Sequence, residues 1–550
     1  MVDLRAAPFH LDVRQLAWVE TTLAKMGPRD RAGQLFVHRS AGFDPDELTM
    51  LAELRPGGIT RFFSGTFEEE SALVQAAQAQ AMVPLLVSSD LEGSRMSMPF
   101  GTEVPNPLAL AAVDDVETTR AIARIMAQEA AAFGVNWTFT PVMDINAAFR
   151  SPIVATRGFG SNVETIRRHA LATIAEFQSQ GVAATVKHWP GEGHDDRDQH
   201  LVTTVIPLTV EEWDATHGSL YRSAIDAGVM AVMSAHIAFP AFVRDGDPQA
   251  GKEAYRPASV SPILNQTLLR QRLGFNGVIV SDATPMAGFG AWGPRSEMLP
   301  QVISSGCDVI LFSNDPVGDL ALIEDAIADG RISEQRLDEA LRRILGLKAA
   351  LGLHLGAKVP DKSGIGRPAS QAMARAATAR APTLVKDVDS LLPLSVQRHR
   401  RVLVVSSGVV LPYSPEPLPL DFPGLLAKEG FEVTVYTPGM TVRPEDWDLM
   451  IYALAEETLL TRGRIFLDWL RLTGDFLESM RRYWHEVPTV MVSFGYPYHL
   501  YDAPRVSCYI NAYASMGSMQ AAVVDCLMGR TPFDGRSPVD TFCGLEDARY

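Results

Sequence analysis

Short and almost continuously apolar runs recur along the first two thirds of the chain, and amphipathic stretches separate them. An apolar run without polar alternation is typical of a strand that is buried on both faces, as in a parallel sheet. Eight runs of this kind occur, at residues 34–38, 58–63, 83–90, 137–144, 182–189, 229–238, 277–282 and 307–313. This order predicts an α/β fold whose first part is a (β/α)8 barrel of the TIM type.

The stretches between these runs carry helix signals. Helices are predicted at residues 68–81, 115–133, 163–180, 209–227 and 262–273. The last of them follows Ser261-Pro262, an N-cap and first-turn signal, and stops before Gly274, as a C-cap would require.

The periodicity breaks between residues 356 and 381, where glycine, proline, lysine and serine precede an Ala/Arg-rich stretch. A second alternation then begins, with strands predicted at 402–406, 433–436, 449–453, 489–494 and 508–512 and helices at 465–484 and 518–528. We therefore predict a catalytic barrel domain over residues 1–355, a connecting segment over 356–381 and a smaller α/β sandwich domain over 382–550.

Charge and composition narrow the classes of partner. The chain has 49 Lys and Arg against 65 Asp and Glu, a net charge of −16 that is not gathered in a tail. This balance disfavours nucleic acid and anionic membrane as partners. Charged residues interrupt the N-terminal stretch, so it does not resemble a secretory signal, and the four scattered cysteines indicate free thiols. A cytoplasmic protein is expected.

Polar side chains concentrate where the predicted barrel strands end. The residues in these positions are Asp90, Glu92, Arg95, Arg157, Lys187, His188, His236 and Asp282. The carboxyl ends of barrel strands carry the active sites of enzymes with this fold, and a charged residue closing an apolar strand is otherwise costly to bury. The sequence therefore predicts a functional rim.

The polar, glycine-rich stretch 191–200 is expected to form a surface loop over the barrel mouth. Metal ligation is an alternative for this region, because His188, His194, Asp195, Asp198 and His200 offer nitrogen and oxygen ligands. Neither an HxH nor an HExxH pair occurs there, so no metal and no other cofactor is expected.

Two motifs, KHWPGEGHDDRDQH at 187–200 and GFNGVIVSDA at 274–283, resemble glycoside hydrolase family 3, and most closely its β-N-acetylglucosaminidase branch. DLEGSR at 90–95 and RGFGS at 157–161 support the resemblance, and INAYASMGSMQAAVVDCLMGRTPFDGRSPV at 510–539 is similar to the family's C-terminal sandwich. The resemblance covers essentially residues 10–550.

The resemblance implies a retaining exo-β-glycosidase that forms a covalent glycosyl-aspartate intermediate on a small carbohydrate substrate. By the same resemblance Asp282 is the nucleophile, and Asp198 with His200 is the acid/base pair. Sugar-binding residues implied in the same way are Asp90, Arg157, Lys187 and His188. We expect Lys187, Arg157 and backbone donors to keep Asp282 ionised.

Terminal β-linked N-acetylglucosamine is the favoured sugar, and for a cytoplasmic member the branch implies recycling of cell-wall fragments. Met98 stands where the branch usually carries a second sugar-contacting arginine, so glucose or xylose remains an alternative. Phosphorolysis is a second alternative, since a neutral imidazole repels an incoming anion less than a carboxylate would. A sugar-binding protein without activity is a third.

Overall fold

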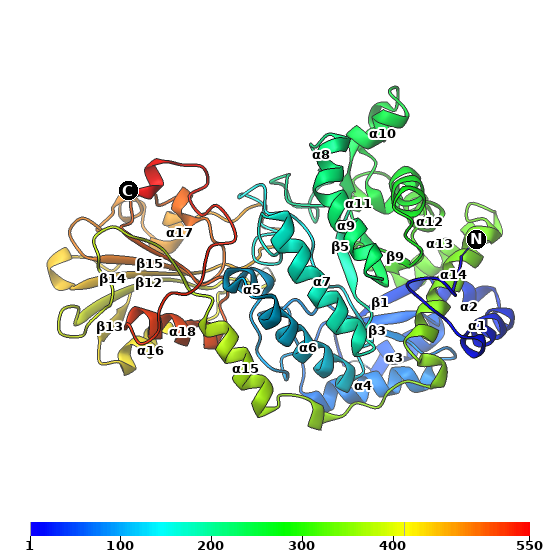
Figure 1. Cartoon of the computed structure of the whole chain (residues 1–550), viewed down its shortest axis with the longest axis horizontal. Helices are drawn as coiled ribbons and strands as arrows, with labels where there is room; N and C mark the ends of the chain where they lie inside the picture. The colour runs from blue at the N-terminus through cyan, green and yellow to red at the C-terminus, as the bar shows by residue number, and fades with distance from the viewer. Residues whose placement is uncertain (1, 44, 412) are drawn as a thin grey trace.

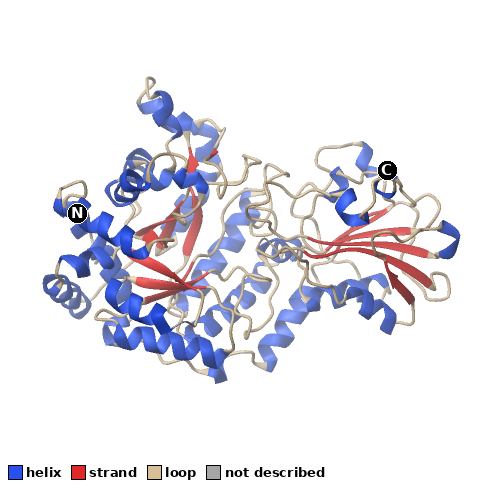
Figure 2. Ribbon diagram, turned by 180° about the vertical axis from the view of Figure 1, so that it is seen from behind, coloured by secondary structure: helices blue, strands red, loops and turns tan. Residues whose placement is uncertain are grey.

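The computed structural model describes residues 2–43, 45–411 and 413–550, which form two bodies side by side (Figures 1 and 2). In the first body, one parallel sheet has the order β10-β1-β2-β3-β4 and another the order β5-β7-β9. Bridges Val142↔Lys187 and Val280↔Val309 join the two sheets at both edges. The eight strands therefore close into a ring, and the predicted (β/α)8 barrel is confirmed. The strands are β1 (Phe36–Ser40), β2 (Gly58–Arg61), β3 (Leu86–Ser89), β4 (Trp137–Thr138), β5 (Thr185–Trp189), β7 (Ala231–Ser234), β9 (Val278–Ser281) and β10 (Ile310–Leu311).

The strands of this ring are buried on both faces, as in parallel sheets that helices cover. Every residue of β5, β7 and β9 is buried. The predicted stretch 262–273 is helical, with π-helical hydrogen bonding over Ile263–Arg272. The α-helices are α1 (Val13–Lys25), α2 (Pro28–Gly33), α3 (Pro45–Leu54), α4 (Phe67–Gln80), α5 (Pro107–Val113), α6 (Val116–Phe133), α7 (Val163–Ser179), α8 (Val210–Ala215), α9 (His217–Asp226), α10 (Pro240–Gly246), α11 (Ala287–Gly290), α12 (Arg295–Ser304), α13 (Pro316–Ala328) and α14 (Glu334–Ala350).

The second body is a sandwich built on one six-stranded sheet of order β11-β16-β15-β14-β12-β13, parallel except for β11. Alternate residues of β12 enter different cores: Val402 and Val404 pack in one, Leu403 and Val405 in the other. Both faces of the sheet are therefore covered. The elements are β11 (Thr383–Asp387), β12 (Arg401–Val409), β13 (Glu432–Val435), β14 (Leu449–Ala455), β15 (Thr489–Ser493), β16 (Cys508–Asn511), α16 (Phe422–Lys428), α17 (Trp469–Thr473) and α18 (Gly517–Leu527).

The helix predicted at 465–484 is wrong over most of its length. Only α17 and a short 3-10 turn at Glu478–Met480 form there. Trp469 packs edge-on against Tyr452 of the sheet, and Gly474 ends α17 in the left-handed conformation. Tertiary contacts of the aromatic residues thus override the apolar periodicity that suggested one long helix.

The predicted connecting segment contains helix α15 (Pro368–Ala379), which contacts α6 of the barrel and α18 of the sandwich. The domain boundaries within 356–381 stay a prediction. All four cysteines are free, and three of them are buried. Among the described helices, none combines the length and apolar character that crossing a lipid bilayer requires.

Candidate active site

Asp282 follows β9 directly, so the barrel fixes its backbone. Its N–H donates to the carbonyl of Ser234 on β7 at 2.8 Å, and its Oδ1 accepts from the N–H of Ala283 at 2.7 Å. The residue is 8% exposed. One carboxylate oxygen is thereby held, and the group stands at the carboxyl ends of the strands, where the sequence predicted it.

Histidines determine the charge of this aspartate. Burial acts to raise the pKa of Asp282, but His188, His236 and His200, together with the Ala283 N–H, lower it below its ordinary value. The expectation that Lys187 and Arg157 perform this task is wrong, because both cations bind other carboxylates.

Those two cations meet at Glu92. Arg157 makes a two-pronged pair with Glu92, with both contacts at 2.8 Å, and Lys187 Nζ lies 2.7 Å from Glu92 Oε1 and 2.6 Å from Asp90 Oδ1. Although burial opposes ionisation, Arg157 and Lys187 lower the pKa of Glu92 to about 2. Asp90, with a side chain 24% exposed, is the most open member of this network, so it is the one best placed to reach a ligand.

Glu92 lies on the predicted rim, but sequence reasoning did not identify it as the partner of Arg157 and Lys187. Arg95, its neighbour in the chain, takes no part in this network and donates to Ser515 of the second body at 3.1 Å. The signal for Glu92 lay in its position: it follows Asp90 by two residues at a strand end, where a buried carboxylate needs cations nearby.

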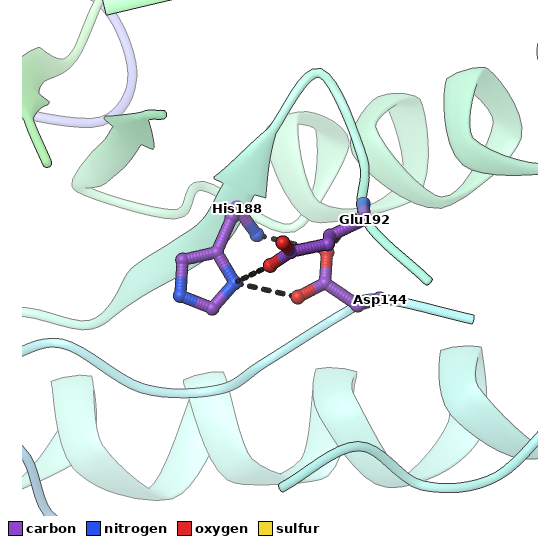
Figure 3. Close-up of side chains that lie close together, drawn as sticks. All are labelled: Asp144, His188 and Glu192. Carbon is purple, nitrogen blue, oxygen red and sulfur yellow. Dashed lines mark hydrogen bonds and ion pairs between the residues drawn. The ribbon is translucent and has the colours of Figure 1, made fainter. Parts of the chain in front are cut away.

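His188 lies in a second cluster, with Asp144 and Glu192 (Figure 3). Its backbone N–H donates to Asp144 Oδ1 at 3.0 Å, and its Nδ1 lies 2.6 Å from Asp144 Oδ2 and 3.6 Å from Glu192 Oε2. Because a carboxylate only accepts, the Nδ1 proton points to Asp144, and this fixes the orientation of the ring.

The two carboxyl groups of this cluster differ in protonation. His188 and two backbone N–H groups outweigh burial and lower the pKa of Asp144. Burial, followed by the charge of Asp144, raises the pKa of Glu192 well above its ordinary value. Glu192 therefore holds a proton more strongly than an ordinary carboxyl group, as expected where two carboxyl groups share one buried site.

Within the described residues these three side chains are the group close enough to share a metal ion, with ligand atoms inside 4.8 Å of one another. Of the five ligands that the sequence suggested, only His188 belongs to this group. Hydrogen bonds already occupy both oxygens of Asp144 and the Nδ1 of His188. The proton between His188 Nδ1 and Asp144 Oδ2 therefore explains why these two side chains lie so close together.

Asp198 and His200 form a hydrogen-bonded pair on the loop after β5. Asp198 Oδ1 accepts from both the backbone N–H and the Nδ1 of His200, each at 2.7 Å. These bonds lower the pKa of Asp198 against the effect of burial, and they leave Nε2 of His200 as the free ring nitrogen. The His200 side chain is 20% exposed, so a substrate can reach it.

Neighbouring residues tie this loop to the strand ends. Gln199 is fully buried; its amide donates to Glu192 Oε2 at 3.0 Å, and its carbonyl accepts from the His236 N–H at 3.1 Å. His236 Nε2 lies 3.0 Å from the carbonyl of Ala283, so it carries the proton and holds the residue after Asp282. His236 thus supports the site from beneath.

The loop packs too closely to tolerate side chains at two glycines. A Cβ at Gly191 would lie 2.4 Å from the ring of His217, and one at Gly193 would lie 1.9 Å from the carbonyl oxygen of Ile145. Both glycines also adopt positive φ angles. The loop between Lys187 and Asp198 is therefore fixed at its start, although its charged tip is exposed.

Comparisons with known proteins agree with this architecture. Residues 21–347 match the family described as "Glycosyl hydrolase family 3 N terminal domain". Over the full length of both chains, the protein is 40% identical to a protein from Cellulomonas fimi named β-N-acetylglucosaminidase/β-glucosidase.

Two solved structures are similar over nearly the whole chain. One is titled "Beta-glucoside phosphorylase BglX bound to 2FGlc" and has a TM-score of 0.92 at 34% identity, covering 98% of this chain and 99% of that one. The other is a β-N-acetylglucosaminidase from a Paenibacillus strain, with a TM-score of 0.81 at 26% identity, covering 94% of this chain and 100% of that one.

Proposed function

The chain belongs to glycoside hydrolase family 3, and from this premise we propose that it is a retaining exo-β-glycosidase with Asp282 as nucleophile and Asp198–His200 as acid/base pair. One observation carries the proposal. A buried carboxylate with a lowered pKa stands at a barrel strand end, within the electrostatic influence of a histidine whose other ring nitrogen is held by an aspartate.

In the first step, the oxygen of Asp282 that does not accept from Ala283 attacks the anomeric carbon. The glycosidic C–O bond breaks, and the leaving oxygen takes the proton from His200 Nε2. In the second step, water returns a proton to that nitrogen while its oxygen bonds to the anomeric carbon and releases the Asp282 carboxylate. Asp198 stabilises the histidine in the required orientation throughout.

The sugar-side residues suit a polyhydroxylated ring. Asp90 is the most open member of the ion network, in which ion pairs hold the Lys187 and Arg157 side chains. Ionised groups held in this way can recognise several hydroxyl groups at once, because each offers a charge-assisted hydrogen bond.

N-acetylglucosamine is the sugar we favour, and glucose is its main rival, since the Cellulomonas fimi relative is named for both activities. A panel of nitrophenyl β-glycosides separates them. We expect turnover of the N-acetylglucosaminide. Turnover of the glucoside or xyloside with none of the N-acetylglucosaminide would overturn this choice of sugar while leaving the mechanism intact.

Phosphorolysis is the second candidate, favoured by the phosphorylase title of a structure that is 34% identical over nearly the full chain. In the second step the histidine is neutral, so it repels an approaching phosphate less than a carboxylate would. Adding tens of millimolar phosphate to the reaction distinguishes the two outcomes: a sugar 1-phosphate supports phosphorolysis, and free sugar alone supports hydrolysis.

A further inference from the structure

One short segment of the second body contacts the loops at the mouth of the barrel. Residues 456–461, which we name the bridging segment, leave β14 and cross to the barrel. At its start, the Glu457 carboxylate accepts from Ser94 Oγ at 2.9 Å and from Asn106 Nδ2 at 3.3 Å on the barrel side. On its own side it accepts from the N–H and Oγ of Ser515, at 2.8 and 2.6 Å. Glu457 thus fastens the segment to the loop that also carries Asp90 and Glu92.

The middle of the bridging segment lies on the loop after β4. Thr458 Oγ1 and Thr156 Oγ1 are 3.4 Å apart, and the Leu459 N–H donates to the carbonyl of Pro152 at 3.4 Å. The Leu459 side chain is buried in the same core cluster as Ala155. Thr156, which contacts Thr458, directly precedes Arg157 in the chain.

The end of the segment reaches the acid/base loop. The backbone N–H of Thr461 donates to Asp198 Oδ2 at 2.7 Å. Within the described residues it is the only hydrogen-bond donor to that oxygen, since His200 uses Oδ1 for both of its bonds. The side chain of Asp198 is completely buried, so water cannot replace this donor without a rearrangement.

We propose that the bridging segment is a positioning element of the active site, and that the Thr461 amide is the group through which the second body holds Asp198 and, through it, His200. The proposal rests on the function proposed above for these two residues. It assigns the second body a part in proton transfer, because Asp198 without this donor would turn or lose its hold on the imidazole.

Thr461→Pro and Thr461→Gly test the amide directly. Thr461 has a φ of +64° and an exposed side chain, so neither change removes core packing. Proline removes the N–H and cannot adopt that φ, whereas glycine keeps the N–H and adopts it readily. Aryl glycosides with good and poor leaving groups serve as substrates, because only the poor ones depend on the acid.

For Thr461→Pro we expect kcat/KM to fall about tenfold to a hundredfold on the poor leaving group and less than about threefold on the good one, part of the usual gain from acid catalysis. Thr461→Gly should keep most of the kcat/KM of the unmodified protein on the poor leaving group. Equal losses on both substrate classes, or no loss on either, would overturn the proposal.

A double-mutant cycle with His200→Ala separates positioning from a general structural effect. If Thr461 acts through His200, Thr461→Pro has no further effect on the poor leaving group once the imidazole is absent. Losses that multiply would mean that the amide works independently of the acid, and the proposal would fail.

Glu457→Gln tests the other end of the segment if Thr461→Pro does not fold. The change keeps the shape of the side chain but weakens the four hydrogen bonds to the carboxylate. As with Thr461→Pro, kcat/KM should fall more on the poor leaving group than on the good one, but by a smaller factor. Glu445→Gln, at an exposed site of the second body, is the matched control and should leave that dependence unchanged. Failure of the proposed function would be distinct: unmodified protein would cleave no glycoside, or Asp282→Asn would retain full activity.

Discussion

On the predicted sugar side of the site, Lys187 and Arg157 are buried against Glu92, and every member comes from a strand end of the barrel or from the residues that follow it. On the proposed acid/base side, the Asp198–His200 pair lies on a long loop, and a backbone N–H of the second body donates to one oxygen of the Asp198 carboxylate. In the first region the charges compensate one another among mostly buried side chains, which favours a single geometry. In the second region Gln199 ties the loop to His236, but the free oxygen of Asp198 depends on a contact between two loops, so this region is the more open to adjustment.

The two regions should therefore respond differently to substitution. Removing one charge from the buried network should damage stability and sugar binding together, since the remaining cations lose their partner. Removing one hydrogen bond from the acid/base loop should alter proton transfer and little else.

Asp282→Asn should have the largest effect. It removes the negative charge of the oxygen that is proposed to attack the anomeric carbon. We expect kcat/KM on an activated aryl glycoside to fall by at least about a thousandfold, as for the loss of a nucleophile in other enzymes. Thermal unfolding should change little or shift downward, since the neighbouring histidines and the Ala283 N–H stabilise the charge of Asp282 in the folded protein. Retention of more than a tenth of the activity would refute the role of Asp282.

Glu92→Gln breaks the buried network on the sugar side. Arg157 and Lys187 would keep their charges with only Asp90 to compensate them, a situation that costs about 3–5 kcal/mol of folding free energy. Denaturant unfolding should report this loss, and KM should rise as well. A variant as stable as the unmodified chain would show that solvent, rather than Glu92, neutralises the two cations.

The sequence contained the features that act over short distances. Asp198 and His200 bond across two residues, and the strand-end position of Asp282 follows from an apolar run that ends in a carboxylate. The barrel and the sandwich followed from periodicity alone. Contacts between distant parts of the chain were invisible: the Thr461–Asp198 bond spans 263 residues and uses a backbone amide, which every residue except proline has.

Asp198→Asn probes the acid/base side by itself. The amide has one acceptor oxygen in place of two, so either His200 or the Thr461 N–H loses its acceptor, and the negative charge that favours the imidazolium is also lost. We expect about a hundredfold loss of kcat/KM on poor leaving groups with a much smaller loss on good ones, within the range usual for acid–base catalysis. Unlike Glu92→Gln, the variant should leave KM for the shared sugar nearly unchanged. A matching rise in KM would mean that the two regions are not separable.

The smallest and most selective test uses pH, because the two buried glutamates shift in opposite directions. The pKa of Glu92 is lowered from 4.5 to about 2, so its stabilisation is present above pH 4.5 and is lost as the pH falls toward 2. The raised pKa of Glu192 has the opposite consequence: its contribution is complete below its unfolded pKa of 4.5 and declines as the pH rises.

Glu192→Gln should therefore stabilise the protein increasingly as the pH rises above 4.5, because glutamine stays neutral without the cost of holding a proton. The difference in melting temperature between variant and unmodified chain is the quantity to measure, and the acid limb governed by Glu92 should remain in place. If that difference is the same at every pH, Glu192 takes up no extra proton on folding. The cluster with Asp144 and His188 would then carry one more negative charge than the hydrogen bonds can account for, and a cation would have to balance it.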